Sequence, residues 1–319
     1  DAADLHLVTA PEVRREDIDH AMSFLRENPG GEIAFGEALR LAFSYDAGQT
    51  GLPILGIDAS GWLAGLLGEE AEGSGFTMIE PPESFKGELR PYQQKGLSWL
   101  AFLDRLGLGP CLADDMGLGK TIQLIALLQH ERTEAGGARL APTLIVVPMS
   151  IVGNWKREAE RFAPELRVLV HHGVDRAQGE AFGEKARGSD VVLTTYALAH
   201  RDRELLEGVR WRRVVLDEAQ NIKNPSAKQA QAVRALEAPR RVALTGTPLE
   251  NRLSELWSIM DFCNPGFLGT QGEFRRSFVV PVERYRDRQR AAQLRQLVRP
   301  FILRRLKIDP TVISDLPEK

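Results

Sequence analysis

Short apolar runs recur between residues 111 and 244, and a stretch with helical spacing of its apolar residues follows most of them. The runs are Cys111–Ala113, Leu144–Val147, Val168–His171, Val191–Thr194, Val214–Leu216 and Val242–Leu244. Strands that are apolar throughout must be buried on both faces, so this alternation predicts an α/β fold with a parallel sheet covered by helices. In such a sheet a ligand binds beyond the carboxyl ends of the strands, where this chain has its polar motifs.

The first 80 residues differ in charge from the rest of the chain. They hold 15 Asp and Glu residues against four Arg and no Lys, whereas the remainder holds 37 bases against 29 acids. Such an asymmetry indicates units with different partners, so we predict a small acidic accessory domain at 1–80 and a second domain at 81–319. Helices are expected at Ile18–Arg26 and Ile33–Phe43. No polar groups converge in this part, which favours a folding or partner-docking role over catalysis.

The strand pattern stops after Pro248. Residues 249–300 are rich in Leu and Arg and are predicted to form a helical protrusion on the sheet domain, with a break at Asn264–Gly266. Residues 271–307 hold 11 Lys and Arg against three acids. This excess fits a solvated helix face as well as a phosphate-binding surface, and charge alone does not separate the two.

The composition excludes several classes of protein. With 43% hydrophobic and 27% charged residues, the chain is typical of a globular protein and not of a disordered one or a fibre. No apolar run approaches the ~18 residues of a membrane-spanning helix, and no apolar stretch follows the acidic first residues as in a secretory signal. Cys111 and Cys263 are the two cysteines, too few for a disulfide framework, and no Cys/His cluster has zinc spacing. These features predict a cytoplasmic protein, and the missing initiator Met indicates a fragment of a longer chain.

One segment has the residues of a phosphate-binding loop. It reads Asp114-Asp115-Met116-Gly117-Leu118-Gly119-Lys120-Thr121 and lies between a predicted strand and a helix predicted at Thr121–Gln129. Backbone N–H groups of a Gly-rich turn and of a helix start can hold phosphates. Lys120 is placed to reach the outer phosphates, and the Thr121 hydroxyl to hold Mg²⁺. The general pattern has Gly where this chain has Asp114, and Gly-Lys-Thr alone is equally compatible with an ordinary loop.

A second polar motif, Asp217-Glu218-Ala219-Gln220, ends the predicted strand Val214–Leu216. A carboxylate at this place can hold Mg²⁺, which assigns Asp217 to the metal, and Glu218 is placed to polarise the attacking water. Acidic residues at a helix start would explain the pair equally well in isolation. They would not explain its position one strand–helix–strand array beyond Lys120, so the two motifs together favour a nucleotide site.

A series of motifs runs in order from about residue 85 to residue 319. They are Leu89–Gln93, Leu112–Thr121, Val147–Ser150 with Asn154 and Trp155, Thr194–Tyr196, Asp217–Gln220 with Ile222–Asn224, Leu244–Pro248, Leu256–Phe262 with Asn264–Gly266, Phe301–Arg305 and Leu316–Lys319. In content and order they resemble the Swi/Snf-type ATPases of helicase superfamily two, bacterial members included. The resemblance implies the first of two RecA-like P-loop lobes, with a helical protrusion and, as in some bacterial members, an extra segment ahead of it.

The resemblance also implies roles for individual residues. The predicted nucleotide-binding residues are Gln93 at the adenine edge, and Asp114, Asp115, Met116, Gly117, Leu118, Gly119, Lys120 and Thr121 at the phosphates. The residues expected near the nucleic-acid backbone are Ser150, Asn154, Trp155 and Thr195, and those expected to couple nucleotide state to DNA contact are Thr245 and Thr247. Two of these have simpler interpretations, because Trp155 also fits a core position and Gln93 the surface of a helix. Gln220 stands where related families commonly have His, which leaves its nucleotide contact open.

The expected function is that of a DNA-dependent ATPase that uses ATP and Mg²⁺. By the resemblance, it moves along double-stranded DNA and remodels a DNA-bound protein, with a second RecA-like lobe in the same chain as its partner. Lys120 and Glu218 are the predicted catalytic residues, and Thr121 and Asp217 the metal ligands. The expected location is the bacterial cytoplasm, at the nucleoid. Two alternatives stay open, namely a strand-separating helicase of the same superfamily and a nucleotide-binding scaffold that does not hydrolyse ATP.

Overall fold

The computed structural model describes residues 5–9, 54–59, 77–246, 252–309 and 312. The chain divides into two compact units. One unit contains Asp1–Phe76 and Gly266–Pro300, and the other contains Thr77–Pro265 and Phe301–Lys319. This division assigns most of the expected protrusion to the unit of the N-terminal segment, and the domain limits 1–80 and 81–319 stay a prediction. The two helices expected near the N-terminus lie outside the described residues.

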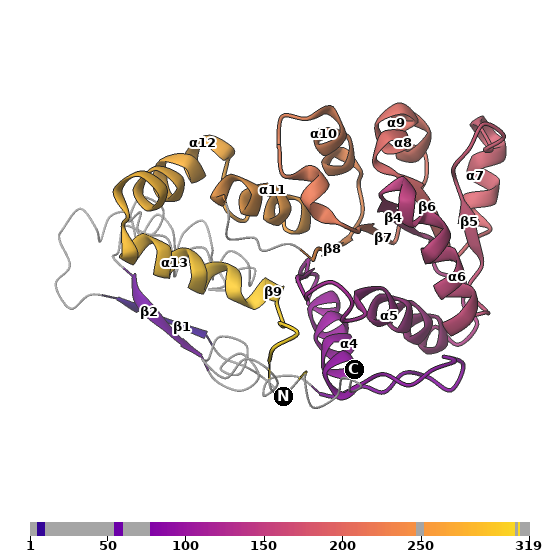
Figure 1. Ribbon diagram of the computed structural model, residues 1–319, viewed down its shortest axis with the longest axis horizontal. Helices are drawn as coiled ribbons and strands as arrows, with labels where there is room; N and C mark the ends of the chain where they lie inside the picture. Colours follow the sequence, from indigo (N-terminus) through magenta and orange to yellow (C-terminus); the bar gives the residue numbers. More distant parts are fainter. Residues whose placement is uncertain (1–4, 10–53, 60–76, 247–251, 310–311, 313–319) are drawn as a thin grey trace, which may run out of the picture. The chain divides into compact units, whose positions relative to one another are not determined.

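A seven-stranded sheet forms the centre of the larger unit (Figure 1). Its strands, in spatial order, are β5 (Val168–Val170), β6 (Val191–Thr195), β4 (Thr143–Val147), β7 (Arg213–Leu216), β8 (Arg240–Leu244), β3 (Cys111–Leu112) and β9 (Ile302–Leu303). Every neighbouring pair is parallel. The predicted parallel sheet is therefore confirmed, and all six predicted strands are present. β9 joins at the edge, where Ile302 pairs with Cys111.

Helices connect the strands and cover both faces of this sheet. Those of the larger unit are α4 (Pro91–Arg105), α5 (Lys120–Glu134), α6 (Val152–Phe162), α7 (Gly179–Arg187), α8 (Tyr196–Arg201), α9 (Arg203–Glu207), α10 (Lys228–Ala235) and α11 (Leu253–Cys263), with 3₁₀ turns η1 (Met149–Ile151) and η2 (Ala219–Ile222). Helix α5 contacts α4 and α6, whereas α10 contacts α8 and α11, and the two groups lie on opposite sides of the sheet in Figure 1. This layering follows from strands that are buried on both faces. None of the helices in the described part of the chain is long and apolar enough to cross a membrane.

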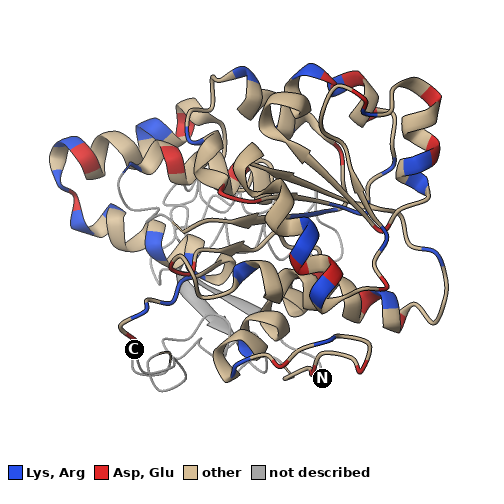
Figure 2. Cartoon of the chain, turned by 45° about the vertical axis from the view of Figure 1, so that its right-hand side comes forward, with Lys and Arg blue, Asp and Glu red and all other residues tan. Residues whose placement is uncertain are grey.

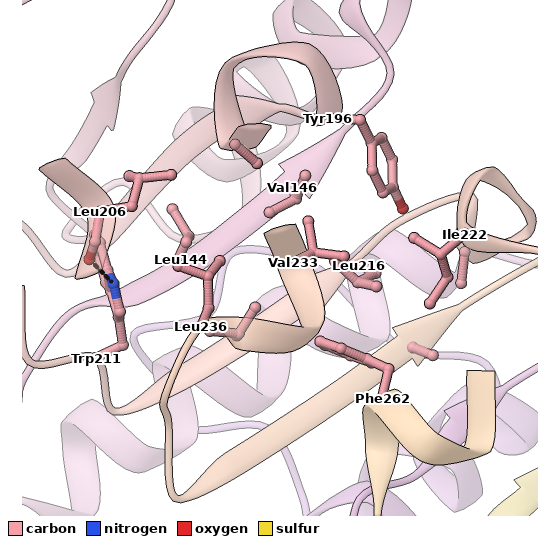
Figure 3. Close-up of a cluster of buried hydrophobic side chains, with 14 of the residues drawn as sticks. Leu144, Val146, Tyr196, Leu206, Trp211, Leu216, Ile222, Val233, Leu236 and Phe262 are labelled. Carbon is pink, nitrogen blue, oxygen red and sulfur yellow. Dashed lines mark hydrogen bonds between the residues drawn. The ribbon is translucent and has the colours of Figure 1, made fainter. Parts of the chain in front are cut away.

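The core on one face of the sheet is a cluster of apolar side chains (Figure 3). Leu144 and Val146 on β4 are two residues apart and point to the same face, as the period of a strand requires. Phe262 on α11 belongs to the same cluster. Trp211 is 2% exposed, and its indole N–H donates to the Leu206 carbonyl at 2.8 Å, so its polar atom is satisfied inside this core. In Figure 2 the strands are almost entirely tan, and charge is concentrated on helices and loops.

The amino ends of the strands carry a buried network of ion pairs. Arg213, the first residue of β7, is fully buried and contacts Asp104 on α4 at 2.5 Å and Glu131 on α5 at 2.7 Å. Arg240 on β8 adds a second contact to Asp104 at 2.6 Å. Burial alone would raise the pKa of Glu131, but the guanidinium groups of Arg213 and Arg212 lower it to about 2. This network fastens α4 and α5 to the sheet at the end opposite the polar motifs.

The smaller unit contains the described strands β1 (Leu5–Thr9) and β2 (Ile54–Ala59), which pair antiparallel. It also contains α12 (Gln271–Phe274), the π-helical segment η3 (Arg275–Arg284) and α13 (Arg288–Val298). The rings of Phe274 and Phe278 pack with their centroids 5.4 Å apart. The described part of residues 249–300 is helical apart from short connections, as predicted.

Candidate nucleotide site

The turn between β3 and α5 has the backbone conformation of a phosphate-binding loop. We call Asp114–Gly119 the phosphate loop. Gly117 and Gly119 have φ values of 86° and 79°, in the left-handed region that favours glycine. A Cβ atom on Gly119 would stand 2.5 Å from Gln93 Nε2, so a side chain is also excluded by space. Helix α5 then begins at Lys120, and its first N–H groups have no partner within the helix. The sequence thus forms an anion-binding turn at this place.

Lys120 lies inside this turn with its amine held by the loop itself. Its side chain is buried, and Nζ donates to the carbonyl oxygens of Asp114 at 2.7 Å and Asp115 at 3.4 Å. Burial lowers the pKa of Lys120, and the nearby carboxylates of Asp114, Glu218 and Asp217 act in the opposite direction. A buried ammonium group that has only carbonyl partners gains from an anion in the loop, because charged hydrogen bonds are stronger than neutral ones.

Asp217 ends β7 with a buried carboxylate, 5% exposed. Its Oδ2 accepts from the Trp155 indole N–H at 2.7 Å, and Oδ1 accepts from the Glu218 backbone N–H at 2.8 Å. The Tyr196 hydroxyl donates to the Asp217 carbonyl at 2.8 Å, so the backbone is fixed as well. Burial raises the pKa of Asp217, although the two donated hydrogen bonds and Lys120 lower it. The carboxylate is therefore oriented but not neutralised, and a nearby cation would stabilise it.

These residues fit a magnesium ion. Mg²⁺ is bound in nucleotide sites through one or two protein oxygens, phosphate oxygens and water. Asp217 offers a rigid carboxylate whose charge is unfavourable without a cation, and Thr121 offers a hydroxyl from the second residue of α5. The chemistry of this donor set matches the predicted metal ligands, and their role stays a prediction.

Glu218 has a strained backbone and a linked side chain. Its φ of 50° and ψ of 54° lie in the left-handed region, which a residue with a side chain seldom adopts. Gln220 Nε2 donates to Glu218 Oε2 at 2.6 Å, and the Thr245 hydroxyl donates to Gln220 Oε1 at 2.9 Å. A hydrogen-bonded chain thus joins the end of β7 to the end of β8. This arrangement gives Gln220 a bridging position, which the sequence motifs left open.

The end of β8 also contacts the phosphate loop. A Cβ atom on Gly246 would stand 2.7 Å from Met116 Cγ and 3.4 Å from Lys120 Nζ. Met116 itself is exposed, and Leu118 is fully buried. Gly246, two residues after β8, therefore packs closely against the phosphate loop. Thr247 lies outside the described residues.

Gln93 lies against the phosphate loop and not on an open helix surface. Its side chain is 8% exposed, and Nε2 donates to the Leu118 carbonyl at 3.1 Å. Its Oε1 accepts from the Arg90 backbone N–H at 3.0 Å, within the start of α4. The helix-surface interpretation is therefore wrong, and adenine recognition stays a prediction. The structure brings Gln93, Lys120, Asp217 and Glu218 to the carboxyl-end side of the sheet.

Asp114 has a different place from the one its motif suggests. Its carboxylate is fully buried, and Oδ1 accepts from Arg305 Nε at 2.9 Å. The side chain is thus directed to a residue 191 positions later, and only its carbonyl oxygen contacts Lys120. Motif spacing could not reveal Arg305, because the two residues meet only once β9 pairs with β3.

The four residues expected near the nucleic-acid backbone do not share one surface. Ser150 on η1 and Asn154 on α6 are exposed, and Asn154 Nδ2 donates to Glu158 Oε1 at 2.7 Å. Trp155 is 2% exposed beneath Asp217, which agrees with the core interpretation and adds a contact to the predicted metal ligand. Thr195 is 5% exposed and caps α8 by accepting from the Leu198 N–H at 3.3 Å. Their contacts with DNA stay predictions, and only the first two are accessible as they stand.

A groove of about 490 Å³ lies beyond the carboxyl ends of β4 and β6. It is lined by Met149, Thr195, Arg201, Asn221 and Gln229, among others. Met149 is a large apolar side chain that is 70% exposed in this groove. Sequence motifs did not indicate Arg201, Asn221 or Gln229, because these donors come together only through the order of the strands.

Comparisons with known proteins point to one family. The family model described as "SNF2-related domain" matches residues 92–319. The chain belongs to this SNF2-related family. It is 52% identical over 236 residues to the Bacillus subtilis protein YwqA. The matched region covers 74% of this chain and 25% of that protein. It is 38% identical over 258 residues to the TATA-binding protein-associated factor MOT1 of Saccharomyces cerevisiae. This match covers 75% of the chain and 14% of MOT1.

A solved structure supports the SNF2-related fold. The Sulfolobus solfataricus SWI2/SNF2 ATPase core in complex with double-stranded DNA matches with a TM-score of 0.69 and 46% identity. The match covers 76% of this chain and 49% of that one. The predicted RecA-like lobe is thereby confirmed. The chain spans about a quarter of YwqA and about half of the Sulfolobus core.

Proposed function

We propose that the protein carrying this chain is a DNA-dependent ATPase that hydrolyses ATP with Mg²⁺ and moves along double-stranded DNA. The observation that carries the proposal is the joining of three motifs at one end of the sheet. Lys120 directly follows the phosphate loop, Asp217 and Glu218 directly follow β7, and Gln220 links Glu218 to Thr245 after β8. One group of residues can thus bind a nucleotide and pass its state to a neighbouring strand end.

The chemistry assigns a separate task to each residue. Lys120 exchanges its loop carbonyl partners for phosphate oxygens and so neutralises their charge. Asp217, oriented by Trp155, and Thr121 would hold the Mg²⁺ ion, which supplies charge neutralisation at the phosphates when bound. Glu218 orients the attacking water, and its hydrogen bond from Gln220 fixes the direction of its carboxylate. Phosphoryl transfer needs positioning and electrostatic stabilisation above all, and these residues provide both.

A second RecA-like lobe completes the proposed enzyme. In phosphoryl transfer an arginine supplied from outside the phosphate loop is worth on the order of 10³–10⁵ in rate. We expect the second lobe to supply this arginine and to close over the γ-phosphate. The similarity to about half of the Sulfolobus core supports this division, because the remaining half of that core has no counterpart among the matched residues.

Duplex DNA is the proposed track, and a protein bound to it the proposed substrate. The groove at the ends of β4 and β6 offers Arg201, Asn221 and Gln229 as donors to phosphate oxygens. The complex of the Sulfolobus core with double-stranded DNA supports this choice, and the name of the MOT1 relative supports a DNA-associated protein as substrate. With DNA as its track, the protein is expected at the nucleoid in the bacterial cytoplasm.

The test measures ATP hydrolysis by the full-length protein with and without duplex DNA. We expect turnover that depends on Mg²⁺ and rises with duplex length, together with displacement of a third strand from a triplex and no separation of a plain duplex. Duplex separation would instead support a strand-separating helicase. ATP binding without turnover would support a scaffold and refute the proposal.

A further inference from the structure

The residues that follow β9 run alongside the phosphate loop. We call Arg304–Asp309 the exit segment. The Ala113 N–H donates to the Leu303 carbonyl at 2.7 Å, and the Asp115 N–H donates to the Arg305 carbonyl at 3.0 Å. Sheet-like pairing thus continues from β3 into the phosphate loop. One side of the loop is therefore fixed by a segment that comes almost 200 residues later in the chain.

The side chain of Arg305 links the exit segment to the phosphate loop and to helices α4 and α5. It is 6% exposed, and its guanidinium group contacts both oxygens of the Asp114 carboxylate, Nε to Oδ1 at 2.9 Å and Nη2 to Oδ2. Nη2 also donates to Gln123 Oε1 on α5 at 2.8 Å, and Nη1 donates to the Tyr92 carbonyl on α4. Such a two-pronged, or bidentate, contact fixes the orientation of the Asp114 carboxylate as well as its distance from Arg305.

Helix α4 leaves space for this contact. A Cβ atom on Gly96 would stand 1.9 Å from Gln123 Oε1 and 2.8 Å from Arg305 Nη2. Any side chain at this position would displace the side chains of Gln123 and Arg305 themselves. The backbone carbonyl oxygen of Asp114 accepts from Lys120 Nζ at 2.7 Å, while its carboxylate is held by Arg305. Arg305 thus determines, through Asp114, where the phosphate-binding amine is held.

Lys307 approaches the same loop from its exposed side. Its backbone N–H donates to Asp115 Oδ2 at 3.1 Å, which fixes the main chain beside the loop. Its Nζ lies 3.4 Å from the point where a Cβ atom on Gly117 would stand. The side chain is exposed and forms no ion pair within the described part of the chain. Among the residues that the structure describes, no carboxylate is paired with this ammonium group beside the loop.

From this geometry we propose that the exit segment is a working part of the phosphate site. Arg305 is a positioning residue that fixes the phosphate loop through Asp114, and Lys307 is a second cation that contacts the ATP phosphates. This inference rests on the proposed ATP binding. Its consequence is that phosphate binding acts directly on the exit segment, because Lys307 belongs to that segment.

The first test measures ATP and AMP binding to the full-length protein by calorimetry in the presence of Mg²⁺. Lys307→Ala should weaken ATP binding by about tenfold, the effect of one lost charged hydrogen bond, and leave AMP binding unchanged. Lys307→Arg should restore most of the ATP affinity. Lys185→Ala, at an exposed lysine on α7, is the matched control and should change neither.

Unchanged ATP affinity in Lys307→Ala, or an equal loss for AMP, would overturn the role of Lys307. Absence of ATP binding by the unaltered protein would overturn the proposed function itself, and the inference with it. The two failures are distinguishable because the second appears without any substitution.

The second test compares two buried arginines. Arg305→Lys keeps the charge but loses the two-pronged contact, so the KM for ATP should rise about tenfold or more. Arg213→Lys makes the same change in the ion-pair network at the opposite end of the sheet, and is the matched control. It should lower the melting temperature and leave the KM for ATP unchanged. An equal KM change in both variants would mean that Arg305 acts only through stability, and would overturn its positioning role.

Discussion

Replacing Trp155 by Phe removes a single hydrogen bond from the predicted metal ligand. The ring stays in its buried site, but the donor to Asp217 Oδ2 at 2.7 Å is lost. A hydrogen bond to a charged group contributes about 1.5–3 kcal/mol. Because 1.36 kcal/mol corresponds to one pKa unit, the pKa of Asp217, already raised by burial, should rise further by about one to two units.

The assay for Trp155→Phe is the pH dependence of kcat/KM for DNA-stimulated ATP hydrolysis. This ratio reports the ionisation of the free enzyme, in which Asp217 must be charged to hold Mg²⁺. Activity is lost as the pH falls through the pKa of Asp217, so a raised pKa moves the acid limb of the profile to higher pH. We expect a displacement of about one to two pH units.

Trp211→Phe provides the matched control. Trp211 is as buried as Trp155, and its indole N–H donates to the backbone carbonyl of Leu206 instead of a carboxylate. Its loss should cost about 0.5–1.5 kcal/mol of stability and leave the acid limb in place. An unmoved acid limb in Trp155→Phe, or an equal displacement in both variants, would refute the assignment of Trp155 to the orientation of Asp217.

Three further predictions concern catalysis, charge and stability. Lys120→Ala should weaken ATP binding and turnover together, whereas Glu218→Gln should spare binding and abolish turnover, and near-normal hydrolysis by the Gln variant would contradict the role of Glu218. Deleting the acidic residues 1–80 should leave duplex DNA affinity equal or higher at fixed salt, and a large loss in a binding titration would assign DNA contact to that segment. The pKa of Glu131 is lowered to about 2, so its contribution to stability is present at neutral pH and is lost as the pH falls from about 4.5 towards 2. Chemical denaturation across that range should show a smaller decline of the free energy of unfolding in Glu131→Gln than in the unaltered protein.

The strands were predictable because a strand buried on both faces consists of consecutive apolar residues. The six predicted runs are almost entirely apolar without alternation, which favours a parallel sheet with two covered faces. β9 has two residues, too few for a pattern, and only the family resemblance indicated it. Lys120, Asp217 and Glu218 were predictable for a related reason, since local motifs lie at strand ends and parallel strands bring those ends together.

Contacts between distant segments could not be predicted in the same way. The pairing of Asp114 with Arg305 depends on β9 lying next to β3, and no spacing rule encodes the order of strands. Trp155 donates directly to Asp217 in space, but the two residues are 62 positions apart in the sequence. No local sequence pattern therefore indicates this hydrogen bond. The motif of Trp155 predicted a place near DNA, which stays a prediction, and the structure adds a hydrogen bond to Asp217.

The bridge through Gln220 has a direction. The carboxylate of Glu218 can only accept, so the amide nitrogen of Gln220 must face it and the amide oxygen must face Thr245, whose hydroxyl then has to donate. An inverted amide would place two acceptors, its own oxygen and the Glu218 carboxylate, opposite each other and lose that bond. A histidine in this position would gain a proton near pH 6.5, whereas an amide has no such transition. The amide of Gln220, which connects the two strand ends, therefore keeps one polarity and stays uncharged across the physiological pH range.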